Sequence, residues 1–397
     1  MKKILFVDDE PNVLQGLQRM LRSMRHDWEM AFAQSGQEAL EVLERNPFDV
    51  VISDMRMPGM NGAQLLTEIM KRHPQAVRII LSGQSDQEAI LRSIGPTHQY
   101  LAKPCDAEAL KSTVARACAL RDLLTSEALQ QLVSRMATLP SLPGLYCEIV
   151  EALQNPEVSL NQVAEIVAKD VGMTAKILQL VNSAFFGLPR QISNVTQAIG
   201  LIGLDTIKTL VLSFQIFAQF SEARIPPSVL DALWCHSMLV AKYARQIAQS
   251  QGQDRQVIED AFTAGLLHDA GKLALIANLP TQYAEVLAQA REEGLPLVEA
   301  EGVLLGVTHA EVGAYLLGLW GLPDPIVEAL AFHHYPAKHL GQGFSPLTAV
   351  HVANALAHEM HSTEPAAVPT LVDIEYLAAL GFTERLSAWQ EACRRTN

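Results

Sequence analysis

The chain has 397 residues, of which 49% are hydrophobic and 18% are charged. This length and composition predict two or three folded domains and exclude an intrinsically disordered protein. Its 30 Lys and Arg residues against 43 Asp and Glu residues give a net charge of −13. Because affinity for nucleic acid depends on neutralising phosphates, this acidic balance argues against a nucleic-acid partner.

The cysteines and the apolar runs indicate the cellular compartment in which we expect the protein. The five cysteines are scattered, and no pair has C-x-x-C spacing, which is typical of free thiols in a reducing compartment. The apolar run that follows Met1 ends at Asp8 and is too short for a signal peptide. The run over 210–220 is broken by polar residues and falls short of a membrane span. We therefore expect a soluble, cytoplasmic protein with no membrane partner.

The first 120 residues alternate apolar runs with segments of helical spacing. The apolar runs cover residues 4–7, 50–52, 77–81 and 99–101. Such an alternation predicts a parallel sheet that is covered by helices on both faces. Residues 106–137 also have helical spacing, which predicts a last helix that runs on as a connector. Either a surface helix or a signalling and dimerising helix fits this connector.

The second half of the chain is predicted to be all-α. The motif Leu139-Pro140-Ser141-Leu142-Pro143 ends the connector, and Ser159 with Gln162 predicts a capping box that opens a helix. Further helices are expected at about 195–220, 228–250, 258–276, 281–293, 308–319, 324–333 and 346–360. No strong strand signal occurs among them.

Polar side chains follow the predicted strands of the first half. Asp8 and Asp9 follow the first apolar run, Asp54 the second, Ser82 the third and Lys103 the fourth. Because the carboxyl ends of parallel strands meet at one edge of a sheet, we expect these groups to converge. Oxygen ligands of this kind suit Mg²⁺, and a carboxylate beside Mg²⁺ can accept a phosphoryl group whose charge a lysine neutralises.

The motifs at these positions resemble the receiver domain of two-component response regulators. They are Val7-Asp8-Asp9-Glu10, the run from Ser53 to Gly62, Leu81-Ser82-Gly83 and Tyr100-Leu101-Ala102-Lys103-Pro104. The resemblance implies that Asp54 is the phospho-acceptor. It implies that Asp9, Asp54 and the backbone carbonyl of Arg56 hold Mg²⁺, with Asp8 assisting through water.

The same resemblance implies further roles and a partner. Ser82 and Tyr100 match the switch pair of the family, and Lys103 matches its phosphate contact. A sensor histidine kinase or a phosphotransfer protein is then expected to supply the phosphoryl group.

An adjacent His-Asp pair marks the second half. His268 and Asp269 offer an imidazole and a carboxylate, a donor set that suits Fe, Mn or Zn, and Lys272 could contact a phosphate. Other histidines lie in apolar helical segments and fit core positions as well as metal ligation: His236, His309, His333, His334 and His351.

This half resembles the HD superfamily of metal-dependent phosphohydrolases. The matching positions are His236, His268, Asp269, Lys272 and, for the binuclear branch, His309, His333 and His334. The final Asp of the HD pattern is replaced by Asn354, and Ala232 stands where the cyclic-di-GMP phosphodiesterase branch has Glu. The Gly-Tyr-Pro loop of that branch is also missing after His334.

A closer resemblance is to the HDOD output domain. Its motifs match Leu139 to Pro143, Lys169-Asp170, Leu180 to Phe186, Ala198 to Gly203 and Trp320-Gly321-Leu322-Pro323. HDOD domains are HD relatives that typically lack the full ligand set and are regarded as signalling outputs.

These resemblances predict four segments. They are an α/β flavodoxin-like receiver with a parallel five-stranded sheet (1–120), a helical connector (121–138), an all-α HDOD domain with an HD-like core (139–360) and a C-terminal helical extension (361–397). We expect a response regulator, phosphorylated on Asp54, that controls a non-catalytic output through a partner protein or a homodimer. The alternative is a phospho-regulated, metal-dependent phosphohydrolase, with a cyclic nucleotide as the candidate substrate.

Overall fold

The computed structural model describes residues 1–82, 97–103, 105–121, 133, 148–149, 152–153, 155, 158–182, 191–203, 207, 227–339, 343–361 and 371–395. The chain divides into two compact units. The first comprises Met1–Thr138 with the segments Gln179–Gln191 and Gly318–Gly321, and the second comprises Leu139–Leu178, Ile192–Leu317 and Leu322–Asn397.

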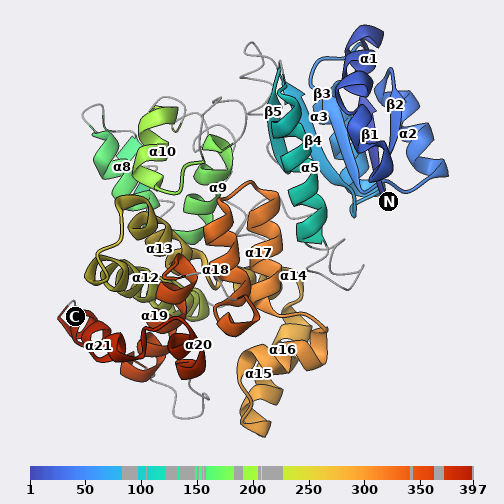
Figure 1. The fold of residues 1–397 in the computed structure, drawn as a ribbon. Helices are drawn as coiled ribbons and strands as arrows, with labels where there is room; N and C mark the ends of the chain where they lie inside the picture. The colour runs from blue at the N-terminus through green and yellow to red at the C-terminus, as the bar shows by residue number, and fades with distance from the viewer. Residues whose placement is uncertain are drawn as a thin grey trace. The chain divides into compact units, whose positions relative to one another are not determined.

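A five-stranded parallel sheet forms the centre of the first unit (Figure 1). Its strands are β1 (Lys2–Val7), β2 (Trp28–Ala33), β3 (Val50–Asp54), β4 (Val77–Ser82) and β5 (Gln99–Ala102), in the order β2-β1-β3-β4-β5. The predicted α/β fold is therefore confirmed. The apolar runs did not reveal β2, because only its two end residues, Trp28 and Ala33, are buried.

Helices connect these strands. They are α1 (Pro11–Met20), the 3₁₀ helix η1 (Arg22–His26), α2 (Gly36–Arg45), α3 (Gly62–Arg72) and α5 (Ala107–Arg121). α2 and α3 contact each other and the sheet, where Leu40 and Leu65 join one apolar core. A side-chain cap fixes the start of each: Ser35 accepts a hydrogen bond from the backbone of Glu38 in α2, and Asn61 forms a capping box in α3. Most of the predicted connector, 121–138, lies outside the described residues.

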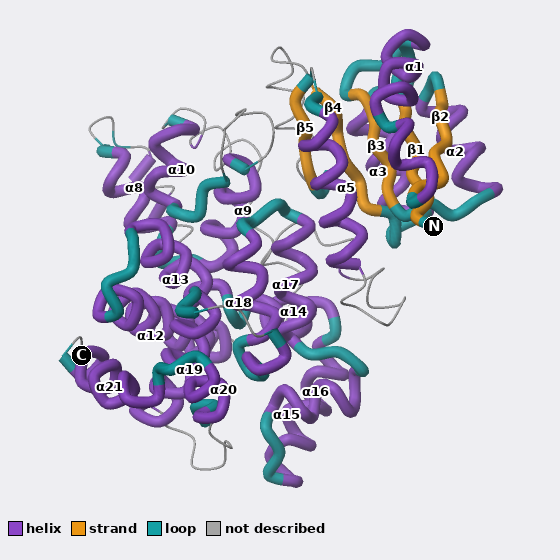
Figure 2. The backbone as a smooth tube through the Cα atoms, viewed as in Figure 1, coloured by secondary structure: helices purple, strands orange, loops and turns teal. Residues whose placement is uncertain are grey.

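Beyond α5 every described element is helical, as predicted (Figure 2). The helices are α8 (Leu160–Val167), α9 (Val171–Val181), α10 (Val195–Ile202), α12 (Pro227–Ser250), α13 (Arg255–Leu267), α14 (Ala270–Asn278), α15 (Pro280–Glu293), α16 (Leu297–Leu305), α17 (His309–Leu319), α18 (Asp324–Phe332), η3 (Pro336–Lys338), α19 (Pro346–His361), α20 (Ile374–Ala379), η4 (Thr383–Arg385) and α21 (Leu386–Arg394). The capping box predicted at Ser159 and Gln162 is confirmed at the start of α8.

Several helix bounds differ from the predicted pattern. α10, the first part of the helix expected at about 195–220, ends at Ile202, where Gly203 has φ 82°. The single helix expected over 258–276 is two helices, because α13 ends at Leu267 and α14 begins at Ala270. The backbone of Asp269 leaves the helical conformation at this break, with φ −96° and ψ 10°. Apolar spacing continues across the break, so the sequence pattern did not reveal it. The sequence also did not reveal α16.

The centre of the second unit is a group of four mutually packed helices. α12, α13 and α19 contact one another, and α18 packs against α13 and α19. The C-terminal α21 packs on α12 and buries Trp389 completely. Among the described residues no single helix has the length and apolar character to cross a membrane; α16 and α17 meet that test only as a pair bent by 78°.

One glycine of the first unit sets a close backbone contact beside the end of β3. A Cβ atom on Gly62 would lie 2.1 Å from the carbonyl oxygen of Asp54. The substitution Gly62→Ala should therefore destabilise the first unit by about 1–3 kcal/mol, because the backbone must shift to make room. Hydrogen exchange of the β3 amides in the full chain measures the loss of protection.

Gly16→Ala is the matched control, since Gly16 is exposed on α1 and a Cβ there meets open space. It should leave the protection of β3 unchanged or slightly higher. Equal protection in both variants would contradict the close contact at Gly62.

Candidate phosphorylation site and metal centre

Two buried carboxylates and a lysine meet at the carboxyl edge of the sheet. Asp8 is 1% exposed after β1, and Asp54 is 7% exposed at the end of β3. The Lys103 Nζ lies 2.7 Å from Oδ2 of Asp8 and also forms an ion pair with Asp54. The backbone N–H of Arg56 donates to Oδ2 of Asp54 at 2.8 Å, and that of Glu10 donates to Oδ1 of Asp8 at 3.0 Å.

The charges of this pocket suit the binding of a cation. Burial raises the pKa of Asp54, and the hydrogen bond from Lys103 only partly offsets it. Burial alone would lower the pKa of Lys103, but its bonds to Asp54 and Asp8 outweigh burial, so its pKa is raised. One ammonium group thus pairs with two buried carboxylates, and the half-buried Asp9 follows Asp8 directly in the chain. This oxygen-rich, negatively charged set fits Mg²⁺.

The other predicted residues of the pocket lie on β4 and β5. Ser82 is 2% exposed at the end of β4, and Tyr100 is 4% exposed in β5, opposite Ile80. The backbone N–H of Lys103 donates to the carbonyl of Ser82 at 2.7 Å. The sheet therefore brings Ser82 and Lys103 next to each other, as the carboxyl-end rule predicts.

In the second unit, glycines allow helices to approach closely where the histidines converge. A Cβ on Gly265 of α13 would lie 2.8 Å from the Cα of Ala241 in α12. A Cβ on Gly271 of α14 would lie 1.9 Å from the backbone oxygen of His309 at the start of α17. No larger residue fits at either crossing without a backbone shift. The break between α13 and α14 is thereby held against both α12 and α17.

A first group of ligand-type atoms forms around that break. His236 of α12, His268 and Asp269 place one ligand atom each within 4.8 Å of one another. Oδ2 of Asp269 lies 3.4 Å from Nε2 of His268 and 2.7 Å from Nζ of Lys272. The predicted Asn354 is also present, since its Oδ1 lies 3.0 Å from Nε2 of His236.

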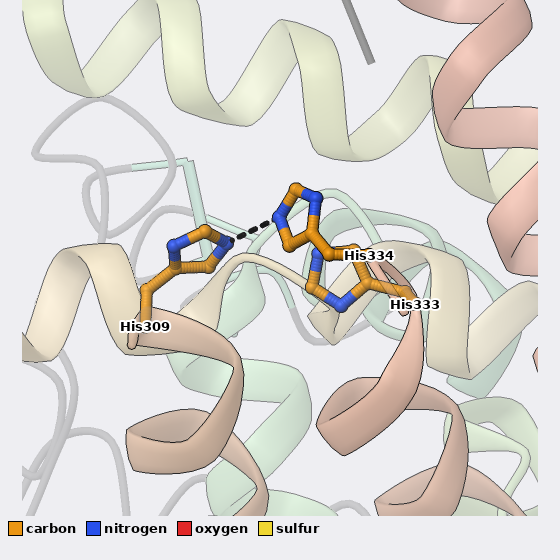
Figure 3. A group of neighbouring side chains, drawn as sticks. All are labelled: His309, His333 and His334. Atoms are coloured by element: carbon orange, nitrogen blue, oxygen red, sulfur yellow. Dashed lines mark hydrogen bonds between the residues drawn. The ribbon is translucent and has the colours of Figure 1, made fainter. Parts of the chain in front are cut away.

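A second group consists of His309, His333 and His334, whose rings point toward one another (Figure 3). Their ligand atoms also lie within 4.8 Å of one another. Nε2 of His334 lies 3.0 Å from Nε2 of His309, which in turn lies 3.2 Å from Oδ1 of Asp269. Asp269 therefore adjoins both groups.

Two imidazoles present buried nitrogen atoms without hydrogen-bond partners. Nδ1 of His268 lies 2.7 Å from the carbonyl of Gly265, and Nδ1 of His333 lies 2.8 Å from that of Leu330. A carbonyl oxygen only accepts, so each Nδ1 carries the proton and each Nε2 has a free lone pair. Nε2 of both rings and Oδ1 of Asp269 are buried and form no hydrogen bond within the described part of the chain, although Nε2 of His268 lies 3.4 Å from Oδ2 of Asp269 and Nε2 of His309 lies 3.2 Å from its Oδ1. A buried lone pair without a donor fits metal coordination.

The ionisation of His236, His333, His334 and Asp269 agrees with this donor set. Burial lowers the pKa of His236 to about 3, and it lowers the pKa values of His333 and His334 well below their ordinary range. Burial would raise the pKa of Asp269, but His268 and Lys272 outweigh burial and hold it well below its usual value. Neutral imidazoles and an ionised carboxylate are the ligand forms of these groups. Burial would lower the pKa of His309, but the nearby Glu301 carboxylate outweighs burial and raises it, so this ring releases a proton when it binds a metal.

Three residues at this site were not predicted from the sequence. His358 of α19 has its ring centroid 4.6 Å from that of His236, and only its spacing four residues after Asn354 could have indicated it. Glu301 lies in α16, a helix that was not predicted, and Tyr283 in α15 carries no motif. Each contacts a candidate ligand directly or through one neighbour.

His351 is a structural residue and not a candidate metal ligand. Its Nδ1 lies 2.8 Å from the carbonyl of His333, and its Nε2 accepts the backbone N–H of Asp373 at 2.8 Å. Both ring nitrogens are therefore occupied. His351 links the His333 segment to the start of α20.

Comparisons with known families match both parts of the chain. A model of the response regulator receiver domain matches residues 4–115, and a model of the HDOD domain matches residues 139–336. Asn354 and His358 lie beyond the second match.

Individual relatives cover part of the chain. An uncharacterized protein of Treponema pallidum is 28% identical over 226 residues, which is 56% of this chain and 42% of that protein. The hydrogenase transcriptional regulatory protein HoxA of Cupriavidus necator is 35% identical over 116 residues, 29% of this chain and 23% of that protein. The crystal structure of the MmoQ response regulator from Methylococcus capsulatus is 24% identical, with 64% of this chain and 98% of that one covered and a TM-score of 0.49. The chain thus spans less than half the length of both curated relatives.

The lowered pKa values predict acid sensitivity of the metal-free second unit. Burial lowers the pKa of His358 to about 4, so this ring stays neutral in the fold while the unfolded chain takes up a proton below its ordinary pKa of 6.5. The unfolded state then binds more protons, and the free energy of unfolding falls with decreasing pH. When the pH of the chelator-treated protein falls from about 7 to about 5, the free energy of unfolding should therefore decrease by about 1–2 kcal/mol less in His358→Gln than in the parent.

Hydrogen exchange of α12 and α19 in the full chain measures this difference. His26→Gln replaces an exposed histidine of the first unit and should match the parent. The same pH dependence in His358→Gln and the parent would contradict the assignment of a neutral, buried His358.

Proposed function

Since the chain is a two-component response regulator with a receiver domain followed by an HDOD domain, we propose that phosphorylation of Asp54 controls its HDOD output. The observation that carries this proposal is the ammonium group of Lys103, which pairs with both Asp8 and Asp54. It is already positioned beside the oxygen that would accept the phosphoryl group. A sensor histidine kinase or a phosphotransfer protein is the donor, as a receiver domain implies.

Each residue of the pocket has a separate role in phosphoryl transfer. A carboxylate oxygen of Asp54 attacks the phosphorus atom, and the bond from phosphorus to the donor breaks. Mg²⁺, held by Asp8, Asp9, Asp54 and the backbone carbonyl of Arg56, would supply neutralisation of the phosphoryl oxygens. Lys103 would exchange its bond to Asp54 for one to the new phosphate. The Ser82 hydroxyl and Tyr100 would then follow as the switch pair.

For the second unit we propose a signalling output that acts through a partner protein or a homodimer. The ligand set supports this role, because Asn354 occupies the position of the final carboxylate and bonds to His236. Ala232 provides no side-chain ligand in place of the Glu of the phosphodiesterase branch. A neutral amide is a weaker ligand than a carboxylate for Fe, Mn or Zn.

The substitution Asp54→Asn should abolish uptake of a phosphoryl group from a small phosphodonor, because the amide is not a nucleophile. Intact mass of the full chain after incubation with acetyl phosphate and Mg²⁺ measures the uptake. Any change in oligomeric state that the donor induces in the parent should disappear as well.

Asp49→Asn is the matched control, because Asp49 precedes the same strand at its opposite end and its Oδ2 accepts the backbone N–H of Lys3. It should be phosphorylated like the parent. A phosphorylated Asp54→Asn variant would show that the acceptor lies elsewhere.

A second candidate function is a metal-dependent phosphohydrolase. It is favoured by three buried atoms that form no hydrogen bond among the described residues, Nε2 of His268, Nε2 of His333 and Oδ1 of Asp269. The two groups of ligand-type atoms would hold the metals, and Fe, Mn or Zn would supply Lewis-acid activation of water and of a phosphate ester. Lys272, whose Nζ lies 2.7 Å from Asp269, is placed to stabilise charge on a bound phosphate.

Restoring the missing carboxylate tests whether this cluster is a metal site. Asn354→Asp should bind Mn²⁺ or Zn²⁺ more tightly than the parent, since a carboxylate beside His236 is a stronger ligand. Metal retained by the full chain after chelator competition measures the change. Asn46→Asp adds the same charge at an exposed position of the first unit and should change nothing. An unchanged affinity in Asn354→Asp would show that the metal site does not include this position.

A further inference from the structure

Glu301 is a fully buried carboxylate that the proposed chemistry does not use. It lies in α16 at 0% exposure. Its Oε2 accepts the backbone N–H of His309 at 2.8 Å and lies 2.6 Å from Nδ1 of the same residue. Its Oε1 accepts the hydroxyl of Tyr283 at 2.8 Å, and Tyr283 is itself 2% exposed. Both carboxylate oxygens are therefore committed to two residues.

The contact decides which nitrogen of His309 faces the cluster. The N–H of Nδ1 points to the carboxylate, so the remaining nitrogen, Nε2, faces His334 and Asp269. The outer nitrogens of His268 and His333 face neutral backbone carbonyls instead. Among the described histidines of the two groups, His309 is thus the one whose outer nitrogen is held by a carboxylate.

We propose that Glu301 and Tyr283 are positioning residues that fix His309 as the strongest imidazole donor of the group His309, His333 and His334. The inference rests on the proposed metal centre and goes beyond it, because it assigns a role to two residues of α15 and α16. The hydroxyl of Tyr283 orients the carboxylate, and the carboxylate orients the imidazole. Neither residue touches the metal.

Glu301 acts on His309 through its negative charge and through the orientation that it imposes on the ring. A carboxylate on Nδ1–H increases the electron density at Nε2 and so strengthens its bond to a cation. Two bonds from one oxygen to the backbone and ring of His309 also limit rotation of the side chain. Outer contacts of this kind typically contribute about 10- to 100-fold to metal affinity.

The test is titration of the full-length, metal-stripped protein with Co²⁺, followed by its visible absorption and by chelator competition. Glu301→Gln should weaken Co²⁺ binding at one of two sites by about 10- to 100-fold and change the absorption bands, because the amide no longer supplies a negative charge at Nδ1. Tyr283→Phe keeps the carboxylate and should give a smaller loss in the same site.

Asp260→Asn is the matched control for loss of a buried negative charge. Asp260 is 5% exposed in the same unit, and its Oδ1 accepts a hydrogen bond from Gln256 rather than from a histidine of the cluster. It should bind Co²⁺ like the parent, with the same absorption bands.

Each other outcome has a distinct meaning. Parent-like binding by Glu301→Gln overturns the positioning role while leaving the metal centre in place. An equal loss in Glu301→Gln and Asp260→Asn also overturns it, since general destabilisation then accounts for the loss. No Co²⁺ uptake by the parent overturns the proposed metal centre and this inference with it. If Glu301→Gln does not fold, Tyr283→Phe decides, and parent-like binding by that variant overturns the proposal.

Discussion

A buried aspartate with a lysine ammonium beside it is the interaction on which the chemistry of both units depends. Lys103 pairs with Asp54 and Asp8 in the first unit, and Lys272 lies 2.7 Å from Asp269 in the second. An ionised carboxylate is costly to bury, so each aspartate needs positive charge close by. One lysine does not balance either pocket, because more acids or unpaired lone pairs adjoin it. Both pockets therefore fit the cation sites proposed above.

Close backbone contacts hold these charges in place. In the first unit the parallel register aligns the ends of β1, β3 and β4, and Gly62 lets the next helix begin directly against Asp54. In the second unit Gly265 and Gly271 let helices cross almost backbone to backbone. The side chains that leave these points have little freedom to separate. The carboxylates of the first unit and the imidazoles of the second lie close together because the backbone places them there, and not because they attract one another.

The carboxyl-end rule made the first pocket predictable from sequence. Each of its side chains directly follows an apolar run, so that knowing the strands is enough to know that the side chains converge. The HD-like ligands were found in another way, through a resemblance to a family pattern. Nothing in the spacing of His236 and Asn354 indicates that these two side chains approach to 3.0 Å. Helical periodicity shows which face is buried but not which helices meet.

The sequence by itself determined the two folds, the acid pocket around Asp54 and the identity of most histidines in the cluster. Period, capping and strand ends suffice for the helices, the strands and the acid pocket, whereas the histidines were found through resemblance to a family pattern. Only the tertiary structure decided that α13 ends at Leu267, that Asn354 bonds to His236 and that Glu301 lies against His309. Asn354 is 118 residues from His236, and Glu301 lies in a different helix from His309. Their roles come from helix crossings, which depend on the packing of many side chains at once and leave no local pattern in the chain.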